Sequence, residues 1–222
     1  MNEIRIDDLA QPVLNDVQRM GLDYGESKHT ELTVEAVLDA ASAHVGLDDF
    51  GPADFRERLG VQLDEMDADG ERTGLGRLLM FNDCVRYASN RLLIGDLLAR
   101  HPEILEAPIV APVIVVGLPR SGTTHLVNLL AADSRFRSLP LWESYEPVPH
   151  PDEPTEVDGV DPRWARCQAA WEAMQVGAPF VAAMHPMAPD HVHEENELMA
   201  ADFSNYNLEW VARAPRWRDH YL

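Results

Sequence analysis

The residues with the clearest chemical potential form a glycine-bounded loop, Gly-Leu-Pro-Arg-Ser-Gly-Thr-Thr, at residues 117–124. An apolar run rich in β-branched residues precedes the loop and an amphipathic segment follows it, so we predict a strand, a loop and a helix in succession. Backbone N–H groups at the start of such a helix, together with the helix dipole, attract anions. Gly117 and Gly122 let an anion approach the backbone closely. The pattern therefore predicts a phosphate-binding loop.

The basic residue of this loop lies in an unusual place. A nucleoside-triphosphatase loop reads G-x-x-x-x-G-K-[ST], whereas here Thr123 occupies the lysine position and Arg120 lies three residues earlier. Without that lysine, the contact with the β- and γ-phosphates of ATP is missing. Arg120 can instead clamp a 5′-phosphate and the group attached to it, with hydroxyl donors from Thr123 and Thr124. This arrangement favours a donor whose leaving group is a nucleoside phosphate.

The distribution of charge also indicates an anionic ligand. The chain has 18 Lys and Arg against 38 Asp and Glu, a net charge of −20, which argues against nucleic acid and anionic membrane surfaces as partners. Between residues 109 and 142, however, three arginines outnumber one aspartate, for a net charge of +2. A basic loop within an acidic protein suits an anionic cofactor.

The elements that position this loop divide the chain in two. Residues 1–108 carry apolar side chains at helical spacing and predict a helical N-terminal region. We expect its helices at residues 7–20, 34–46, 52–66 and 75–100.

The remaining residues, 109–222, predict the N-terminal part of a P-loop α/β domain. Residues 112–116 have the pattern of a strand buried on both faces, which is typical of a parallel sheet. A helix over 122–132 is expected to turn its leucines inward, and a second strand is expected at 136–141. A further helix is expected at 163–175. The fold class is thus α/β, with an incomplete parallel sheet.

Together these segments resemble a known family. The loop, the helix that follows it and the stretch Ser-Leu-Pro-Leu-Trp-Glu-Ser-Tyr-Glu-Pro-Val-Pro at 138–149 resemble the 5′-phosphosulfate region of sulfotransferases, in particular a bacterial branch with a helical N-terminal region. Residues 90–105, 185–186 and 193–196 also resemble that branch. The resemblance implies 3′-phosphoadenosine-5′-phosphosulfate as the donor and a hydroxyl of a small-molecule or lipidic compound as the acceptor. The implied donor-binding residues are Gly117, Pro119, Arg120, Ser121, Gly122, Thr123 and Thr124.

Sulfuryl transfer to an alcohol needs a general base and positive charge on the oxygens that gain charge. Arg120 supplies the charge. Glu143 is the candidate base, because it follows the second expected strand and lies where the family's glutamate bases are found. Trp142 beside it favours desolvation and a raised pKa. The alternative is that Glu143 is a solvated loop acid.

A second cluster of chemically active residues lies near the C-terminal end of the chain: His185, His191, His193, Glu194 and Glu195. His191 and His193 are a conceivable metal-ligand pair, but their spacing matches no standard zinc site, so we expect no metal. Glu194 and Glu195 fit the start of a helix, where acidic residues are favourable. One of them, or His185, is a candidate for the acceptor pocket.

Part of the implied donor site has no counterpart in the sequence. The family binds the 3′-phosphate of the donor with an arginine and a serine near a later strand, and no such strand is recognisable before Leu222. We therefore expect an incomplete sulfotransferase: a natural truncation, a fragment or an inactive remnant. The alternatives are a P-loop kinase or nucleotidase, disfavoured by Thr123 in the lysine position, and a non-catalytic binding module.

The sequence also bears on location. Cys84 and Cys167 are far apart, and the N-terminus lacks the basic start and apolar run of a secretory signal. We therefore expect reduced thiols and a cytoplasmic location. The most apolar run, residues 109–118, is about as long as a strand and too short to span a bilayer, so we expect no membrane insertion. Neither the acceptor nor the oligomeric state is indicated.

Overall fold

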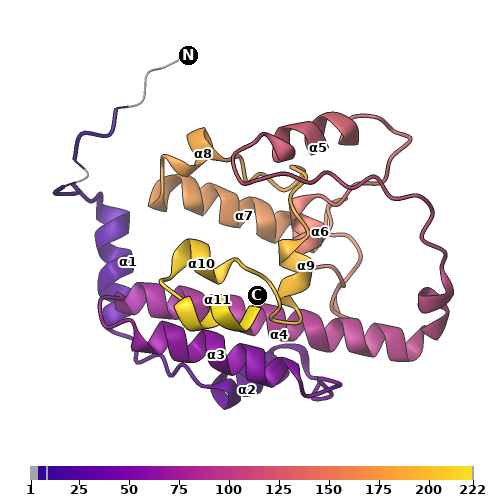
Figure 1. The fold of residues 1–222 in the computed structure, drawn as a ribbon, viewed down its shortest axis with the longest axis horizontal. Coiled ribbons are helices and arrows are strands. Elements are labelled where there is room, and N and C mark those ends of the chain that lie inside the picture. The colour runs from indigo at the N-terminus through magenta and orange to yellow at the C-terminus, as the bar shows by residue number, and fades with distance from the viewer. Residues whose placement is uncertain (1–4, 9, 222) are drawn as a thin grey trace.

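The computed structural model describes residues 5–8 and 10–221, and its described elements are helical (Figure 1). The long helix α4 runs across the molecule, with α2 and α3 along one side of it and α5, α7 and α8 on the other. The helices are α1 Asp16–Glu26, α2 Val34–Val45, α3 Phe55–Ala68, α4 Gly74–Arg100, η1 Pro102–Glu106, α5 Thr123–Ala131, α6 Leu141–Tyr145, α7 Pro162–Gly177, α8 Val181–Met184, α9 Asn196–Ala200, α10 Leu208–Val211 and α11 Pro215–Tyr221.

Capping residues explain where the N-terminal helices begin and end. Thr33 Oγ1 accepts a hydrogen bond from Ala36 N at 3.2 Å at the start of α2, and Gly46 ends that helix with a φ of 71°. Thr73 caps α4 in the same way, because a side-chain oxygen at this position satisfies a free N–H group of the first turn. The helices expected at 34–46, 52–66 and 75–100 are confirmed as α2, α3 and α4.

The first expected helix is placed wrongly. It was expected at residues 7–20, of which residue 9 lies outside the described range, but α1 begins at Asp16 behind the capping residue Asn15 and continues past Gly21. It crosses the start of α4, where a side chain on Gly25 would collide with the backbone of Leu75. Gly25, which has no side chain, therefore allows α1 and α4 to cross closely.

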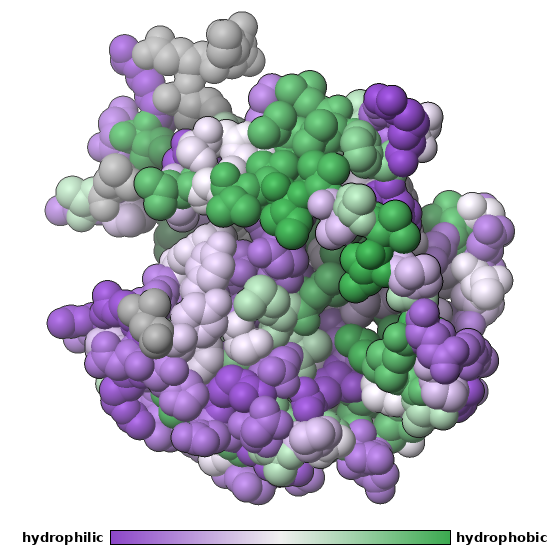
Figure 2. All heavy atoms as spheres, turned by 45° about the vertical axis from the view of Figure 1, so that its right-hand side comes forward, coloured by the Kyte–Doolittle hydropathy of each residue, from purple (hydrophilic) through white to green (hydrophobic). Residues whose placement is uncertain are grey.

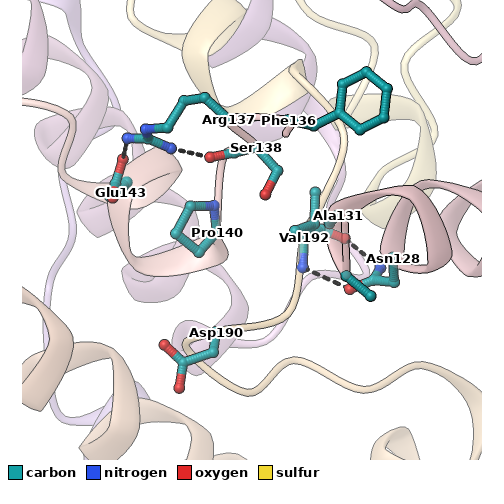
Figure 3. A pocket seen from close by; sticks show the side chains of 10 residues that line it. Asn128, Ala131, Phe136, Arg137, Ser138, Pro140, Glu143, Asp190 and Val192 are labelled. Atoms are coloured by element: carbon teal, nitrogen blue, oxygen red, sulfur yellow. Dashed lines mark hydrogen bonds and ion pairs between the residues drawn. The ribbon is translucent and has the colours of Figure 1, made fainter. Parts of the chain in front are cut away.

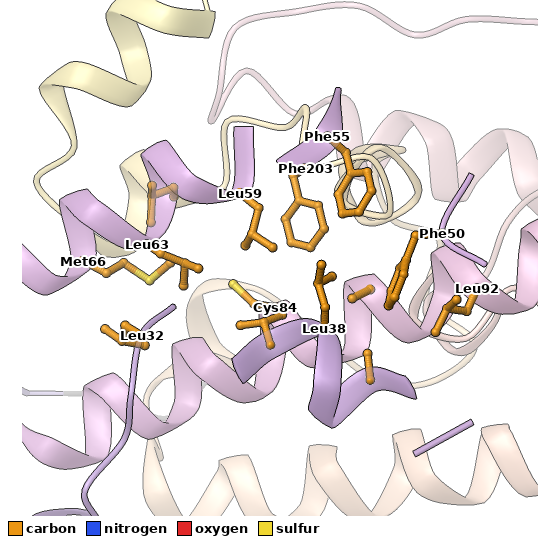
Figure 4. Close-up of a cluster of buried hydrophobic side chains, with 14 of the residues drawn as sticks. Leu32, Leu38, Phe50, Phe55, Leu59, Leu63, Met66, Cys84, Leu92 and Phe203 are labelled. Carbon is orange, nitrogen blue, oxygen red and sulfur yellow. The ribbon is translucent and has the colours of Figure 1, made fainter. Parts of the chain in front are cut away.

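One hydrophobic core joins both parts of the chain. Its buried side chains come from α2, α3 and α4, and Figure 4 shows Phe203 among them, beside Phe55 and Leu59. Trp217 of α11 is also buried in this core and donates its indole N–H to the Asn205 carbonyl at 3.1 Å. Residues beyond 200 therefore fold against the N-terminal helices.

The two expected strands are absent from the described residues. Residues 113–116 form neither a strand nor an isolated bridge, and Ala111 has a φ of 43°, outside the β region. Pairing near the second expected strand is limited to an isolated antiparallel bridge between Pro140 and Val192, and Leu141 already begins α6. A strand needs neighbours for its hydrogen bonds, and no described segment pairs with residues 113–116. The predicted α/β core is thus not confirmed.

Apolar side chains of the first expected strand are exposed to solvent, because no described segment pairs with it. Ile114 is 76% exposed and Val116 is 86% exposed, although the sequence indicates burial on both faces. The helix expected at 122–132 forms as α5, but Leu126 and Leu129 are exposed rather than turned inward. Figure 2, which turns this side of the molecule forward, shows apolar side chains gathered at the surface. Among the described helices, none combines the length and apolar character needed to cross a bilayer.

Candidate functional site

The loop at 117–124 is a tight turn that leads directly into α5. A side chain on Gly117 would have its Cβ 2.7 Å from both Ser121 Oγ and Thr123 Cγ2, so these two side chains would have to shift. Gly122 has a φ of 95°, and Arg120 a φ of 66°, so both lie in the left-handed region. Such a turn brings successive N–H groups toward one side, as an anion site requires.

The start of α5 has the features of an anion site. Gly122 occupies the N-cap position, where it has no side chain with which to satisfy the first N–H groups of the helix. Arg120 is exposed, and its Nη2 donates to the Met184 carbonyl at 3.3 Å. Among the described residues, no carboxylate forms an ion pair with Arg120, so its guanidinium can bind an anion.

Residues 184–194 lie alongside α5 and fix its position. Asn128 Nδ2 donates to the Val192 carbonyl at 2.9 Å, and Asn128 Oδ1 accepts from Val192 N at 3.0 Å. Thr124, one turn earlier on α5, donates its hydroxyl to Glu194 Oε1 at 2.8 Å. Sequence reasoning missed Asn128; the available signal was its position four residues after Thr124, which places both on the same helix face.

The candidate base Glu143 lies in the first turn of α6, not after a strand. Its carboxylate forms an ion pair with Arg137, as Figure 3 shows. Glu143 and Asn128 both line an open hollow of about 520 Å³ between α5, the segment before α6 and the 190–192 stretch. The ring of Trp142 packs under Arg163, whose guanidinium carbon lies 4.8 Å from the ring centroid. Glu143 thus shares a hollow with α5, the helix that begins at the loop.

The second cluster comes together more closely than its spacing suggests. The ring of His193 lies 4.9 Å from that of His185 and 5.2 Å from that of His191, centroid to centroid. Glu194 follows directly, and the Thr124 hydrogen bond joins it to the loop. Of the two glutamates expected to open a helix, Glu195 occupies the N-cap position of α9, whereas Glu194 turns toward α5.

The environment sets the charges of this cluster. Burial, with a contribution from His185, lowers the pKa of His193 to about 4, and burial also lowers the pKa of His191. Burial opposes the ionisation of Glu194, but hydrogen bonds from Thr124 and the backbone, together with nearby histidines, outweigh it and lower the pKa of that carboxyl. At neutral pH the His191 and His193 rings are therefore neutral and Glu194 is negative. Neutral imidazole and carboxylate are also the ligand forms that metals bind.

A partly buried ion pair, which the sequence did not reveal, anchors both site segments to α4. Arg86 Nη2 lies 2.9 Å from Glu197 Oε2 in α9, and the Arg86 guanidinium carbon lies 4.5 Å from the ring centroid of Tyr145 in α6. Asn90 Nδ2 adds a hydrogen bond to the Tyr145 carbonyl at 2.7 Å. One face of α4 therefore positions the elements that carry Glu143 and follow Glu194.

Comparison with known proteins assigns the family. The model of the sulfotransferase family matches residues 112–222, which includes the loop, α5, Glu143 and the histidine cluster. The chain belongs to the sulfotransferase family. The resemblance found in the loop is thereby confirmed. No curated protein sequence matches the chain significantly.

Two solved structures resemble the chain over most of its length. Sulfotransferase STF1 from Mycobacterium tuberculosis H37Rv is 29% identical with a TM-score of 0.73, over 87% of this chain and 53% of its own. Sulfotransferase STF9 from Mycobacterium avium is 26% identical with a TM-score of 0.74, over 88% of this chain and 50% of its own. The chain thus spans about half the length of either protein.

Proposed function

We propose that this chain is the part of a sulfotransferase that binds the 5′-phosphosulfate of its donor, 3′-phosphoadenosine-5′-phosphosulfate. The observation that carries the proposal is the loop geometry: left-handed turns at Arg120 and Gly122 lead directly into the N-terminus of α5, in a chain of the sulfotransferase family. The acceptor is proposed to be a hydroxyl of a small-molecule or lipidic compound.

Each loop residue has a defined role in the proposal. The 5′-phosphate of the donor lies against the N–H groups between Pro119 and Thr124, where the dipole of α5 stabilises negative charge. The guanidinium of Arg120 contacts the phosphosulfate and stabilises the charge that develops on the bridging oxygen as it leaves. The hydroxyls of Ser121 and Thr123 add hydrogen bonds, and that of Thr124 does so when it turns away from Glu194. The anion would be held by charge-assisted hydrogen bonds throughout.

Glu143 is the proposed general base. The acceptor hydroxyl attacks sulfur, its oxygen forms the new S–O bond, the bond to the bridging oxygen breaks, and the proton passes to the Glu143 carboxylate. Support comes from the hollow that Glu143 shares with α5 and from the ion pair with Arg137, which orients the carboxylate. The adjoining histidines are proposed to border the acceptor.

We infer weak donor binding and little turnover for these 222 residues alone. The chain spans about half of either matched sulfotransferase, and no 3′-phosphate site is recognisable in it. Buried Cys84 and Cys167 are unpaired thiols, which supports a cytoplasmic location. A kinase or nucleotidase remains the competing proposal, and the measurement that separates it is Mg²⁺-dependent hydrolysis of ATP.

The decisive experiment is calorimetric titration with 3′,5′-adenosine bisphosphate. Arg120→Ala removes charge-assisted hydrogen bonds worth about 1.5–3 kcal/mol, so affinity should fall about tenfold or more. Arg135→Ala is the matched control, because Arg135 is also exposed and basic but pairs with Asp133 after α5. The affinity of this variant for 3′,5′-adenosine bisphosphate should stay within about twofold of the parent chain's. Equal affinities of the two variants would refute the site.

A further inference from the structure

Two histidines and one carboxylate converge beside the phosphate loop. One ligand atom from each of His185, His193 and Glu194 lies within 4.8 Å of the other two. All three residues are partly buried and partly open to solvent, so a small ion can reach them. Two imidazoles and one carboxylate are a donor set that borderline divalent metals accept. We propose that these residues form a binding site for a divalent transition-metal cation of the zinc class.

The hydrogen bonds around the histidines leave one ring nitrogen of each for a cation. His185 Nδ1 lies 3.1 Å from the Pro186 carbonyl, and His193 Nε2 lies 3.3 Å from the same oxygen. A carbonyl oxygen only accepts hydrogen bonds, so these nitrogens carry the protons. In the neutral form of each ring, the second nitrogen, His185 Nε2 or His193 Nδ1, is the one with a free lone pair. Metal-binding histidines typically donate their second N–H to a carbonyl or carboxylate in this way.

The carboxylate is held in a similar manner. Glu194 Oε1 accepts the hydroxyl of Thr124 at 2.8 Å, while Oε2 lies 3.7 Å from His193 Nδ1. The oxygen that faces the histidine is therefore the one left for a cation. Tetrahedral ligands at about 2.0 Å from zinc lie about 3.3 Å apart. One ligand atom of each residue lies within 4.8 Å of the other two, so the side chains must draw closer together to bind the cation.

A third histidine borders the site. The His191 ring lies 5.2 Å from that of His193 and 6.1 Å from that of His185. Its Nδ1 is buried and has no hydrogen-bond partner among the described residues. A buried polar atom without a partner is costly, and a water bound to the cation would satisfy it. The spacing of His191 and His193 alone did not predict a metal site. The fold adds His185, whose ring lies near both of them.

The site is coupled to the phosphate loop through Glu194. The Glu194 carboxylate holds the hydroxyl of Thr124 and places a negative charge beside the anion site, which opposes binding of an anionic donor. A cation on Glu194 offsets that charge. Linkage requires that cation and donor then strengthen each other's binding by the same factor. The cation would thereby regulate donor binding without taking part in the transfer reaction.

Calorimetry with Zn²⁺, and absorption spectra with Co²⁺, test the site directly on the 222-residue chain. We expect one equivalent of Zn²⁺ to bind and tetrahedral Co²⁺ bands to appear. His185→Ala and Glu194→Gln should each weaken Zn²⁺ binding about tenfold or more. His125→Ala is the control, because His125 is exposed on α5 outside the cluster. Circular dichroism establishes whether each variant is folded. If His185→Ala is not folded, His185→Asn is used in its place.

The coupling has its own measurement, which separates this proposal from the donor site. Zn²⁺ should raise the affinity for 3′,5′-adenosine bisphosphate about fivefold or more in the parent chain, and not in His185→Ala, which controls for Zn²⁺ bound directly by the nucleotide. Arg120→Ala should lose nucleotide affinity but keep Zn²⁺ binding. Equal Zn²⁺ affinity in the parent chain and in both His185→Ala and Glu194→Gln, or no stoichiometric binding at all, would overturn the metal site even if the donor site holds.

Discussion

The ion pair between Arg86 and Glu197 should control the stability of the whole site. Its atoms are 2.9 Å apart, and the two side chains are only 25% and 17% exposed. At an effective dielectric constant of about 20, the Coulomb attraction at that distance is about 6 kcal/mol, opposed by the cost of desolvating both groups. Removing one partner of such a pair typically costs about 3–5 kcal/mol, because the other charge is left buried.

Arg86→Met removes the charge and keeps much of the side-chain volume. With the partial exposure considered, we expect about 3 kcal/mol of destabilisation in urea unfolding, and a fall in Tm of about 5–12 °C for a chain of this size. Asp83→Asn is the control, because Asp83 also pairs with Arg86, at 3.4 Å, but is 58% exposed. Such a surface contact contributes less than about 1 kcal/mol.

The effect should depend on pH in a defined direction. Burial raises the pKa of Glu197, and Arg86 opposes that increase, so loss of Arg86 should raise this pKa further. A carboxyl whose pKa is higher folded than unfolded gains stability as the pH falls through the folded value. The penalty of Arg86→Met should therefore be smaller at pH 5 than at pH 7.5. A penalty below about 0.5 kcal/mol, or one that grows on acidification, would refute the reasoning.

Two further predictions concern the loop and the base. Gly122→Ala forces a side chain onto a φ of 95° and should cost about 1–2 kcal/mol of stability in thermal unfolding, whereas Gly177→Ala, at an open position in a helix, should be neutral or stabilising. In a protein that includes the rest of the fold, Glu143→Gln should lower turnover about a hundredfold while donor affinity stays within a few-fold; turnover at the parental rate would exclude Glu143 as the base.

Local features of the sequence were enough to predict most helices and the loop. Thr33 and Thr73 each precede an apolar periodicity and cap the helix that follows, and Gly46 ends one in the left-handed region. The loop was predictable for the same reason, since Gly117 lies close to Ser121 and Thr123 of the same loop and Gly122 has a φ of 95° at the start of α5. Interactions of this range are encoded in neighbouring residues.

The strands, and the contact between Glu194 and the loop, depend on partners far away in the chain. The apolar residues 113–116 indicate a strand, but pairing is a property of two segments, and here no described segment supplies the second. Likewise, the hydrogen bond from Thr124 to Glu194 joins residues 70 positions apart. Histidines and carboxylates gathered within 185–195 were the available signal, but their spacing alone could not show that His185 meets His193.

The absence of strand pairing does not remove the basis for anion binding. No sheet lies beneath α5 among the described residues, and α5 and its loop are held by contacts with the segment from Met184 to Glu194, through Arg120, Thr124 and Asn128. These contacts fix the helix N-terminus, where the anion would bind, whereas the exposed Val116 precedes the loop in the chain. We therefore expect phosphate binding to need only the local turn and its support from residues 184–194. Productive transfer needs more, because it requires the donor, the acceptor and Glu143 to be aligned together. Donor-loop binding and turnover should accordingly be separable in this chain.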